Sequence, residues 1–468
     1  MASQPQTIGS LKASGWKSVP IKEELRANAV AKIRSGQPLF EAVLGYEDTV
    51  MPQLENALLA GHDIVFLGER GQAKTRMIRS LTGMLDEWMP IIHGSEINDD
   101  PYHPVSRYAR DLVAEHGDDT AISWVHRDAR YGEKLATPDT SIADLIGEVD
   151  PIRVAEGRYL SDELTLHYGL VPRTNRGIFS INELPDLAER IQVGLLNVLE
   201  ERDVQIRGYK IRLPLDLLLV ASANPDDYTN RGRIITPLKD RFGSQIRTHY
   251  PLEVSTEIDI MRQESRPMSI GDVHVSTPAF MQEIVATFSH VARQSSQVNQ
   301  RSGVSVRLSV SNLEVLGASA LRRALRSGET VVVPRVSDMD ALAASTSGKI
   351  EIESLEEGRD GLIIENMVKA AVLTVFKSRV TPPEYKDVIL AFEDGLIFQT
   401  GEDVTSVEEA SLVEKVPAIR ATILGLTDGD ESPAAIASAV EFLVEGLHLS
   451  KRLNKDASGG RTQYRARS

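Results

Sequence analysis

Between Ile64 and Thr75 the chain reads IVFLGERGQAKT, an apolar stretch that runs into a glycine-containing loop and ends in Lys-Thr. This is the form of a phosphate-binding P-loop, G-x-x-x-x-G-K-[ST], with alanine where the last glycine is usual. Glycines in such a loop let backbone N–H groups turn toward the β-phosphate, and the following helix presents its positive end. The pattern predicts a nucleoside triphosphate site formed by Gly68, Glu69, Arg70, Gly71, Gln72, Ala73, Lys74 and Thr75.

Within this loop the chemistry rests on two side chains. Lys74 is expected to reach the β and γ oxygens of the nucleotide, and Thr75 is expected to ligate Mg²⁺. Ala73 fits this role if its φ is negative, because only glycine adopts positive φ at no steric cost. The expected cofactors are therefore ATP and Mg²⁺. The alternative is a strand-turn-helix corner that shares the form of a P-loop and binds nothing.

A second motif is GIFSINE, in which an apolar stretch from Gly177 ends in Asn182 and Glu183. In P-loop ATPases a strand ends in an acidic pair, the first acid holding a Mg²⁺-bound water and the second polarising the attacking water. Glu183 is thus the candidate general base. Asn182 can accept a hydrogen bond from a Mg²⁺-bound water but lacks the charge that helps to hold the ion. We expect weaker Mg²⁺ binding or slower turnover from this substitution.

Three further polar residues follow in the order expected of such a site. Asn224 ends the apolar stretch that begins at Asp216, where a neutral amide can orient the attacking water. Arg241 lies in PLKDRFG after a predicted helix, and a guanidinium is the usual partner of transition-state phosphate charge. Arg307 lies in VSVRLS at a predicted helix start. A lone arginine is more often a surface ion-pair partner, so the order of the motifs carries the inference.

Five short apolar runs predict parallel strands that are buried on both faces and separated mostly by helical patterns. They are Ile64–Leu67, Ile122–Val125, Ile178–Ile181, Leu217–Ala221 and Gln245–His249. The alternation predicts an α/β fold with the nucleotide at the carboxyl ends of the strands. Helical patterns then dominate after Pro251. The predicted divisions are an N-terminal extension (1–37), the nucleotide-binding core (38–250), a mostly helical lid (251–385), a region of unassigned role (386–450) and a basic, disordered tail (451–468).

Composition excludes several classes of protein. The 468 residues include 52 Lys and Arg against 67 Asp and Glu, a net charge of −15, which disfavours nucleic acid as the main partner. Cysteine is absent, so disulfides and cysteine-ligated metals are excluded, and no structural metal is expected from the scattered histidines. No apolar run approaches the ~18 residues of a membrane span. We expect a cytoplasmic protein without a membrane partner.

From Pro38 to Arg326 the chain resembles the AAA+ superfamily, specifically the branch of the magnesium chelatase ATPase subunit and the MoxR-type ATPases. Gly68–Thr75 resembles Walker A, Ile178–Glu183 resembles Walker B, and Asn224 resembles the first sensor. The segment 195–225 resembles the helix, hairpin and sensor strand of this branch, and 144–177 resembles its insertion before Walker B. The predicted hairpin exposes Arg207, Lys210 and Arg212.

The resemblance implies a P-loop AAA+ core with a five-stranded parallel sheet, followed by a helical lid domain. Arg241 would be the arginine finger given to a neighbouring subunit and Arg307 the second sensor. It implies a homo-oligomeric ring, expected to be a hexamer, and a partner protein with a von Willebrand A domain, so that ATP hydrolysis remodels the partner or supports metal insertion. Asn182 departs from the usual Asp of this branch.

Three functions from different classes remain open at this point. The first is a chelatase-like ring ATPase, favoured by Glu183, Asn224, Arg241 and Arg307 together. The second is a nucleotide-gated scaffold that binds ATP and scarcely hydrolyses it, favoured by Asn182. The third is a transcription-activator ATPase, which the absence of a helix-turn-helix pattern and the acidic charge disfavour.

Overall fold

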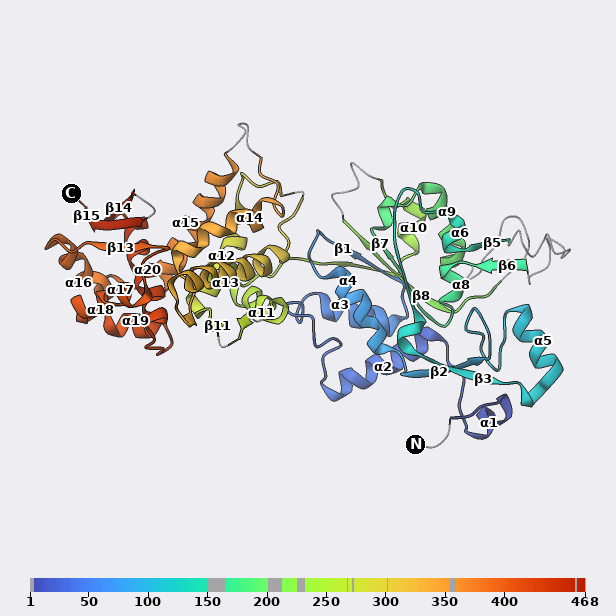
Figure 1. Cartoon of the computed structure of the whole chain (residues 1–468). Helices are drawn as coiled ribbons and strands as arrows, with labels where there is room; N and C mark the ends of the chain where they lie inside the picture. The colour runs from blue at the N-terminus through green and yellow to red at the C-terminus, as the bar shows by residue number, and fades with distance from the viewer. Residues whose placement is uncertain are drawn as a thin grey trace. The chain divides into compact units, whose positions relative to one another are not determined.

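The structure is a computed structural model that describes residues 4–149, 165–200, 213–224, 232–266, 268–271, 273–300, 302–353, 359–458 and 461–467. These residues form two compact units, Met1–His249 and Tyr250–Ser468, each with its own core (Figure 1). Within the described ranges no helix has the length and apolar character needed to cross a membrane.

The first unit alternates helices and strands along the chain, as the apolar pattern predicted. Its elements are α1 (Ile8–Ala13), α2 (Ile21–Ser35), α3 (Val50–Ala60), β1 (Ile64–Leu67), α4 (Lys74–Ser80), β2 (Trp88–Ile92), α5 (Arg107–His116), β3 (Ile122–His126), β4 (Tyr131–Leu135), α6 (Ile142–Leu145), β5 (Gly147–Val149), β6 (Leu166–Tyr168), α8 (Leu170–Arg173), β7 (Gly177–Asn182), α9 (Glu189–Glu200), β8 (Leu217–Ala223), α10 (Thr236–Arg241) and β9 (Ser244–Arg247).

A five-stranded parallel sheet in the order β4-β7-β8-β1-β9 is the centre of this unit. The predicted α/β fold with five parallel strands is therefore confirmed. The prediction that Ile122–Val125 is one of these five strands was wrong. The run Ile122–Val125 lies in β3, which pairs antiparallel with β2 in a separate two-stranded sheet. The fifth parallel strand is β4, YGEKL, whose polar sequence suits a half-buried edge strand rather than a strand covered on both faces.

The two faces of the sheet are covered by different helices. On β1, Ile64 and Phe66 belong to a cluster that includes side chains of α2, α3 and α4, whereas Val65 and Leu67 belong to a cluster with α9 and α10. Successive side chains of a strand point to opposite faces, so a continuous apolar run feeds both layers. Figure 1 shows α2–α4 on one side of the strands and α9 and α10 on the other.

The N-terminal segment is an integral part of this unit rather than an extension from it. Helix α2 buries Ile21, Leu25 and Ala29 in the hydrophobic cluster on one face of the sheet. Glu24 of the same helix forms a buried ion pair with Arg130, with an N–O distance of 2.7 Å. A predicted boundary at residue 37 therefore does not divide two bodies.

The second unit is mainly helical and also contains two small sheets. Its elements are α11 (Val254–Glu264), β10 (Ser269–Ile270), β11 (Val273–Val275), α12 (Ala279–Gln294), α13 (Arg307–Ser327), β12 (Val331–Val332), α14 (Leu342–Ser347), α15 (Asp360–Arg379), α16 (Pro382–Glu393), β13 (Phe398–Gly401), α17 (Ser406–Ala410), α18 (Leu412–Lys415), α19 (Arg420–Leu426), α20 (Pro433–Leu449), β14 (Leu453–Ser458) and β15 (Arg461–Ala466).

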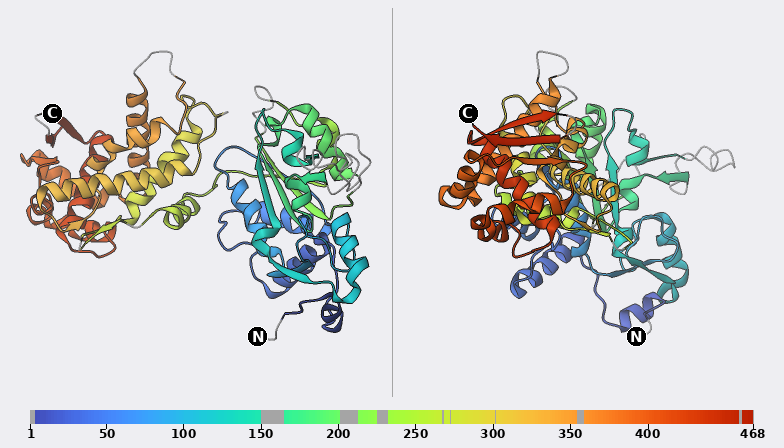
Figure 2. Two further views of the ribbon diagram at one scale, coloured as in Figure 1. Left: turned by 45° about the vertical axis from the view of Figure 1, so that its right-hand side comes forward. Right: turned by 60° about the vertical axis from the view of Figure 1, so that its left-hand side comes forward.

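One hydrophobic core runs through this unit from Met261 to Tyr464, so the predicted lid and the region 386–450 belong to one body. The yellow, orange and red helices of Figure 2 gather around that core. The prediction of a disordered tail was wrong. Strands β14 and β15 pair as an antiparallel hairpin with β13, and Leu453 and Tyr464 are each 2% exposed. Several basic residues of the tail pair with acidic residues, as Arg461 does with Asp403. The basic composition of this segment therefore did not indicate disorder.

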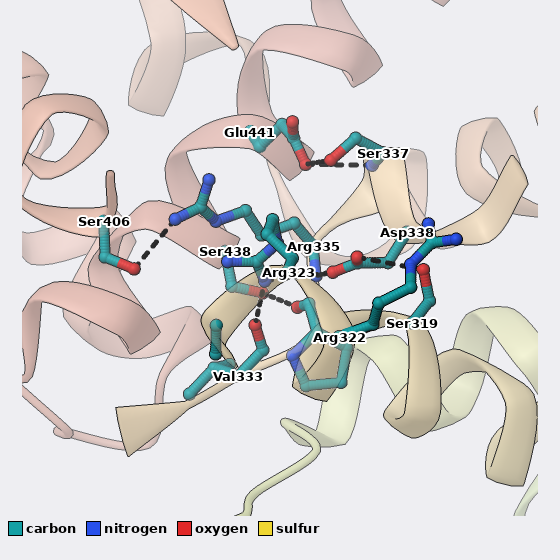
Figure 3. Close-up of polar contacts among 12 residues, drawn as sticks. Ser319, Arg322, Arg323, Val333, Arg335, Ser337, Asp338, Ser406, Ser438 and Glu441 are labelled. Carbon is teal, nitrogen blue, oxygen red and sulfur yellow. Dashed lines mark hydrogen bonds and ion pairs between the residues drawn. The ribbon is translucent and has the colours of Figure 1, made fainter. Parts of the chain in front are cut away.

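Buried charges brace the interior of the second unit (Figure 3). Arg335 is fully buried and donates to Glu409 at 2.9 Å, while Arg323 pairs with Asp338 at 3.0 Å. A buried guanidinium needs such hydrogen-bond acceptors because the transfer of its charge from water is costly. This network belongs to residues 323–441 and lies outside the predicted nucleotide site.

Candidate active site

The predicted phosphate-binding loop connects β1 directly to α4. The Gly68 N–H donates to the Ala223 carbonyl at 3.1 Å, which ties the loop entrance to the end of β8. A Cβ atom at Gly68 would lie 1.9 Å from Thr248 Oγ1 and 2.2 Å from Gln72 Oε1, so any larger residue there would force these two side chains to shift. Gly71 has φ +75°, a conformation that glycine adopts without strain. Gly71 thus has a backbone conformation that favours glycine, whereas Gly68 is constrained by the side chains around it.

The side chain of Gln72 holds the loop from within. Its Oε1 atom accepts from the Glu69 N–H at 3.0 Å and from the Thr248 hydroxyl at 2.7 Å. The Tyr46 hydroxyl lies 2.8 Å from the Gln72 carbonyl oxygen and 2.7 Å from that of His249, and burial raises the pKa of this tyrosine. Tyr46, which precedes α3, and Thr248 and His249, which follow β9, therefore hold the loop in place.

Lys74 and Thr75 are the first two residues of α4. The Lys74 ammonium is buried, and it donates to the carbonyl oxygens of Gly68 and, at 2.7 Å, of Glu69. Ala73, directly before the helix, has φ +54°, so the condition under which alanine would fit without strain, a negative φ, is not met. A left-handed alanine costs roughly 1–2 kcal/mol. The loop is thus strained at the position where a P-loop usually has glycine.

Neighbouring strands place the other predicted groups at the same edge of the sheet. Asn182 ends β7 and Glu183 follows it, with φ +56° and ψ +48°. Asn224 follows β8 directly and is 2% exposed. The Glu183 N–H donates to Ser222 Oγ at 3.2 Å, which joins the ends of the two strands. Strained non-glycine residues concentrate at functional sites, and both Ala73 and Glu183 are of this kind.

Sequence reasoning missed an acidic residue beside Asn182. Glu133 of β4 accepts a hydrogen bond from the Asn182 amide, whose own oxygen accepts from Ser222 at 3.2 Å. Arg79 of α4 donates to both oxygens of Glu133, at 2.8 and 3.0 Å. Hydrogen bonds from Arg79 are the largest cause that lowers the pKa of this carboxyl. The signal was the alternation in YGEKL, which puts Tyr131 and Glu133 on one face of a strand.

The residues present fit ATP and Mg²⁺. A buried ammonium inside a glycine loop at a helix start matches a phosphate group. Mg²⁺ favours oxygen ligands and is usually held by one or two protein groups together with substrate phosphates, a role open to Thr75 and Asn182. The described residues contain no cluster of three or more His, Cys, Asp or Glu that could hold a metal ion.

The two predicted arginines lie in different units. Arg241 is the last residue of α10 and is exposed on the first unit. Arg307 is the first residue of α13, as predicted, and is exposed on the second unit. The roles of Arg241 as an arginine finger and of Arg307 as the second sensor stay predictions. The predicted hairpin with Arg207, Lys210 and Arg212 lies outside the described residues.

Several curated proteins are similar to this chain, and their names agree with the predicted branch. The magnesium-chelatase 38 kDa subunit of Rhodobacter capsulatus is 28% identical over 246 residues, which cover 50% of this chain and 62% of that protein. Subunit ChlI of Nostoc sp. is 25% identical over 231 residues, covering 48% and 58%. The chain thus spans about three-fifths of the length of these relatives. No protein-family model matches it.

Among solved structures, the BchI–BchD complex of magnesium chelatase aligns with 71% of this chain and 98% of its own, at 19% identity and a TM-score of 0.36. NtrX from Brucella abortus in complex with ATP aligns with 77% of this chain and 69% of its own, at 14% identity and a TM-score of 0.40. Scores below 0.5 add no weight to the assignment. The sequence similarity to these relatives and the five-stranded parallel sheet agree with the resemblance to AAA+ ATPases of the magnesium chelatase type.

Proposed function

We propose that the chain is a chelatase-like AAA+ ATPase that binds Mg²⁺ and ATP and hydrolyses the nucleotide in a homo-oligomeric ring. The observation that carries the proposal is the position of the groups. The loop follows β1, while Glu183 and Asn224 follow β7 and β8, and these three strands are parallel neighbours. All of the groups therefore meet at one edge of the sheet, where ligands of open parallel sheets bind.

Each residue has a role that its chemistry supports. Lys74 neutralises negative charge on the β and γ phosphates, while loop N–H groups and the start of α4 bind their oxygens. Glu183 accepts the proton of the attacking water, and Asn224 orients that water. Thr75 and Asn182 hold the Mg²⁺ shell. When bound, Mg²⁺ neutralises charge that develops on the transferred phosphoryl group.

A ring follows from the resemblance and from Arg241. An exposed guanidinium at the end of α10 can serve the site of a neighbouring subunit, where it stabilises transition-state charge. We propose a hexamer in the cytoplasm that acts on a partner with a von Willebrand A domain, either remodelling it or supporting metal insertion. The names of the curated relatives support this direction, since they are magnesium-chelatase subunits.

The test separates binding from hydrolysis in a single variant. Glu183→Gln is expected to keep ATP affinity and to lose phosphate release, because the amide cannot accept the proton of the attacking water. The control is Glu87→Gln, which removes one exposed carboxylate of the same unit. Phosphate release and ATP binding are measured for both variants and for the unchanged chain. Unchanged turnover in Glu183→Gln would refute the assignment of the base.

Asn182 favours a second function, a nucleotide-gated scaffold with little hydrolysis. An amide at this position carries no charge toward Mg²⁺, and the same amide is engaged by Glu133 and Ser222. ATP binding without turnover at every protein concentration would select this reading. Turnover that rises with protein concentration would exclude it in favour of the ring ATPase.

A further inference from the structure

The amide of Asn182 has a fixed orientation at the end of β7. Its Nδ2 atom donates to Glu133 and its Oδ1 atom accepts from Ser222, and the side chain is only 6% exposed. A carboxylate at position 182 would bring two acidic oxygens to hydrogen-bond distance, which like charges disfavour. The amide at 182 and the carboxylate at 133 therefore form a complementary pair on adjacent parallel strands.

The same carboxylate also contacts the helix that follows the phosphate loop. Arg79 forms a two-point ion pair with Glu133 and is 63% exposed. Residues four positions apart share one face of a helix, so Arg79 lies on the face of α4 that carries Thr75. Glu133 thus contacts both Asn182 and the face of α4 that carries Thr75, the predicted Mg²⁺ ligand. The hydroxyl of Tyr131 donates to it as well, at 3.0 Å.

We propose that Glu133 supplies the carboxylate charge of the Mg²⁺ shell that is missing at position 182, with Asn182 as the residue that positions it. This inference rests on the proposed nucleotide-binding function. The carboxylate thus lies on β4, the strand next to β7, and Arg79 links it to helix α4. Without nucleotide, the guanidinium neutralises Glu133; a divalent cation competes with it for the same carboxylate.

The decisive measurement is the affinity for ADP across a Mg²⁺ series, with EDTA as the zero point, since ADP avoids turnover. In the unchanged chain, Mg²⁺ is expected to tighten ADP binding. Glu133→Gln is expected to raise the Mg²⁺ concentration needed for this effect about 10- to 100-fold, as loss of supporting groups around a metal does. ADP affinity in EDTA should change little, because Lys74 and the loop are intact.

Arg79→Met is the matched control for a merely structural role. It removes the same ion pair and leaves the carboxylate, so both variants are expected to lower the unfolding temperature. Only Glu133→Gln should lose the Mg²⁺ response. Asn182→Asp alone is expected to weaken the response by pairing two acids. The double variant Glu133→Gln/Asn182→Asp exchanges the two groups and is expected to restore it.

The outcomes separate this inference from the function on which it rests. An ADP affinity that Mg²⁺ tightens equally in the unchanged chain and in Glu133→Gln would overturn the role of Glu133 and leave nucleotide binding intact. Equal loss of the Mg²⁺ response in Glu133→Gln and Arg79→Met would also overturn it, in favour of a structural ion pair. Absence of ADP binding in the unchanged chain would refute the proposed function itself.

Discussion

Gly68 of the predicted phosphate-binding loop has side chains of other residues close to the place of its missing Cβ. The Cβ of an alanine there would approach Thr248 Oγ1 and Gln72 Oε1 at 1.9 and 2.2 Å, which no rotamer change at position 68 relieves. Overpacking of this kind costs about 1–3 kcal/mol. Separation of Thr248 from Gln72 adds about 0.5–1.5 kcal/mol for the lost buried hydrogen bond. Gly68→Ala is thus expected to lower the free energy of unfolding by about 2–4 kcal/mol.

For a unit of this size, such a change lowers the unfolding temperature by about 4 to 16 °C. Gly83→Ala is the matched control, because nothing lies within 4 Å of a Cβ built at Gly83. Thermal unfolding of both variants and the ATP affinity of each make the assay. Gly68→Ala should lose stability and affinity together. Equal stability of the two variants would refute the steric account of the loop.

Three further outcomes are expected. Ala73→Gly should leave the free energy of unfolding within about 1 kcal/mol and keep ATP affinity, because relief of the strain at φ +54° offsets the flexibility of glycine; a large loss by chemical denaturation would contradict this. Tyr464→Ala should destabilise the second unit by about 3–5 kcal/mol, since this buried ring anchors β15; an unchanged denaturation midpoint would instead favour a disordered tail. Burial raises the pKa of Glu409 well above 4.5, so the folded state holds a proton that the unfolded chain releases, and its contribution to stability falls as pH rises from about 4.5. Glu409→Gln should therefore flatten the dependence of stability on pH over that range, and an equal slope in denaturation series would refute the raised pKa.

Much of the first unit could be predicted because its short apolar runs alternate with helical patterns and its polar motifs follow the ends of those runs. Glu183 and Asn224 were placed correctly because parallel strands end at one edge. The edge strand β4 escaped detection because it is half-buried, so its sequence lacks a continuous apolar run. Glu133 escaped detection with it. Strand β4 is identified by its parallel pairing with β7, and the local sequence of β4 does not show this pairing.

Errors elsewhere have the same physical origin, contacts between residues far apart in the chain. The C-terminal strands form because β13 supplies their hydrogen-bond partners and Asp403 and Glu445 neutralise Arg461 and Lys455. Composition counts charges and cannot locate the groups that pair with them.

The central claim is that ATP is hydrolysed at sites shared between subunits, and mixing of two inactive variants tests it most directly. Glu183→Gln lacks the base, and Arg241→Ala lacks the guanidinium that a neighbour requires. Each alone should release almost no phosphate from Mg-ATP. When mixed, a subunit with intact Glu183 can receive Arg241 from its neighbour, and phosphate release should reappear. Full activity of Arg241→Ala alone, or no recovery on mixing, would contradict the account.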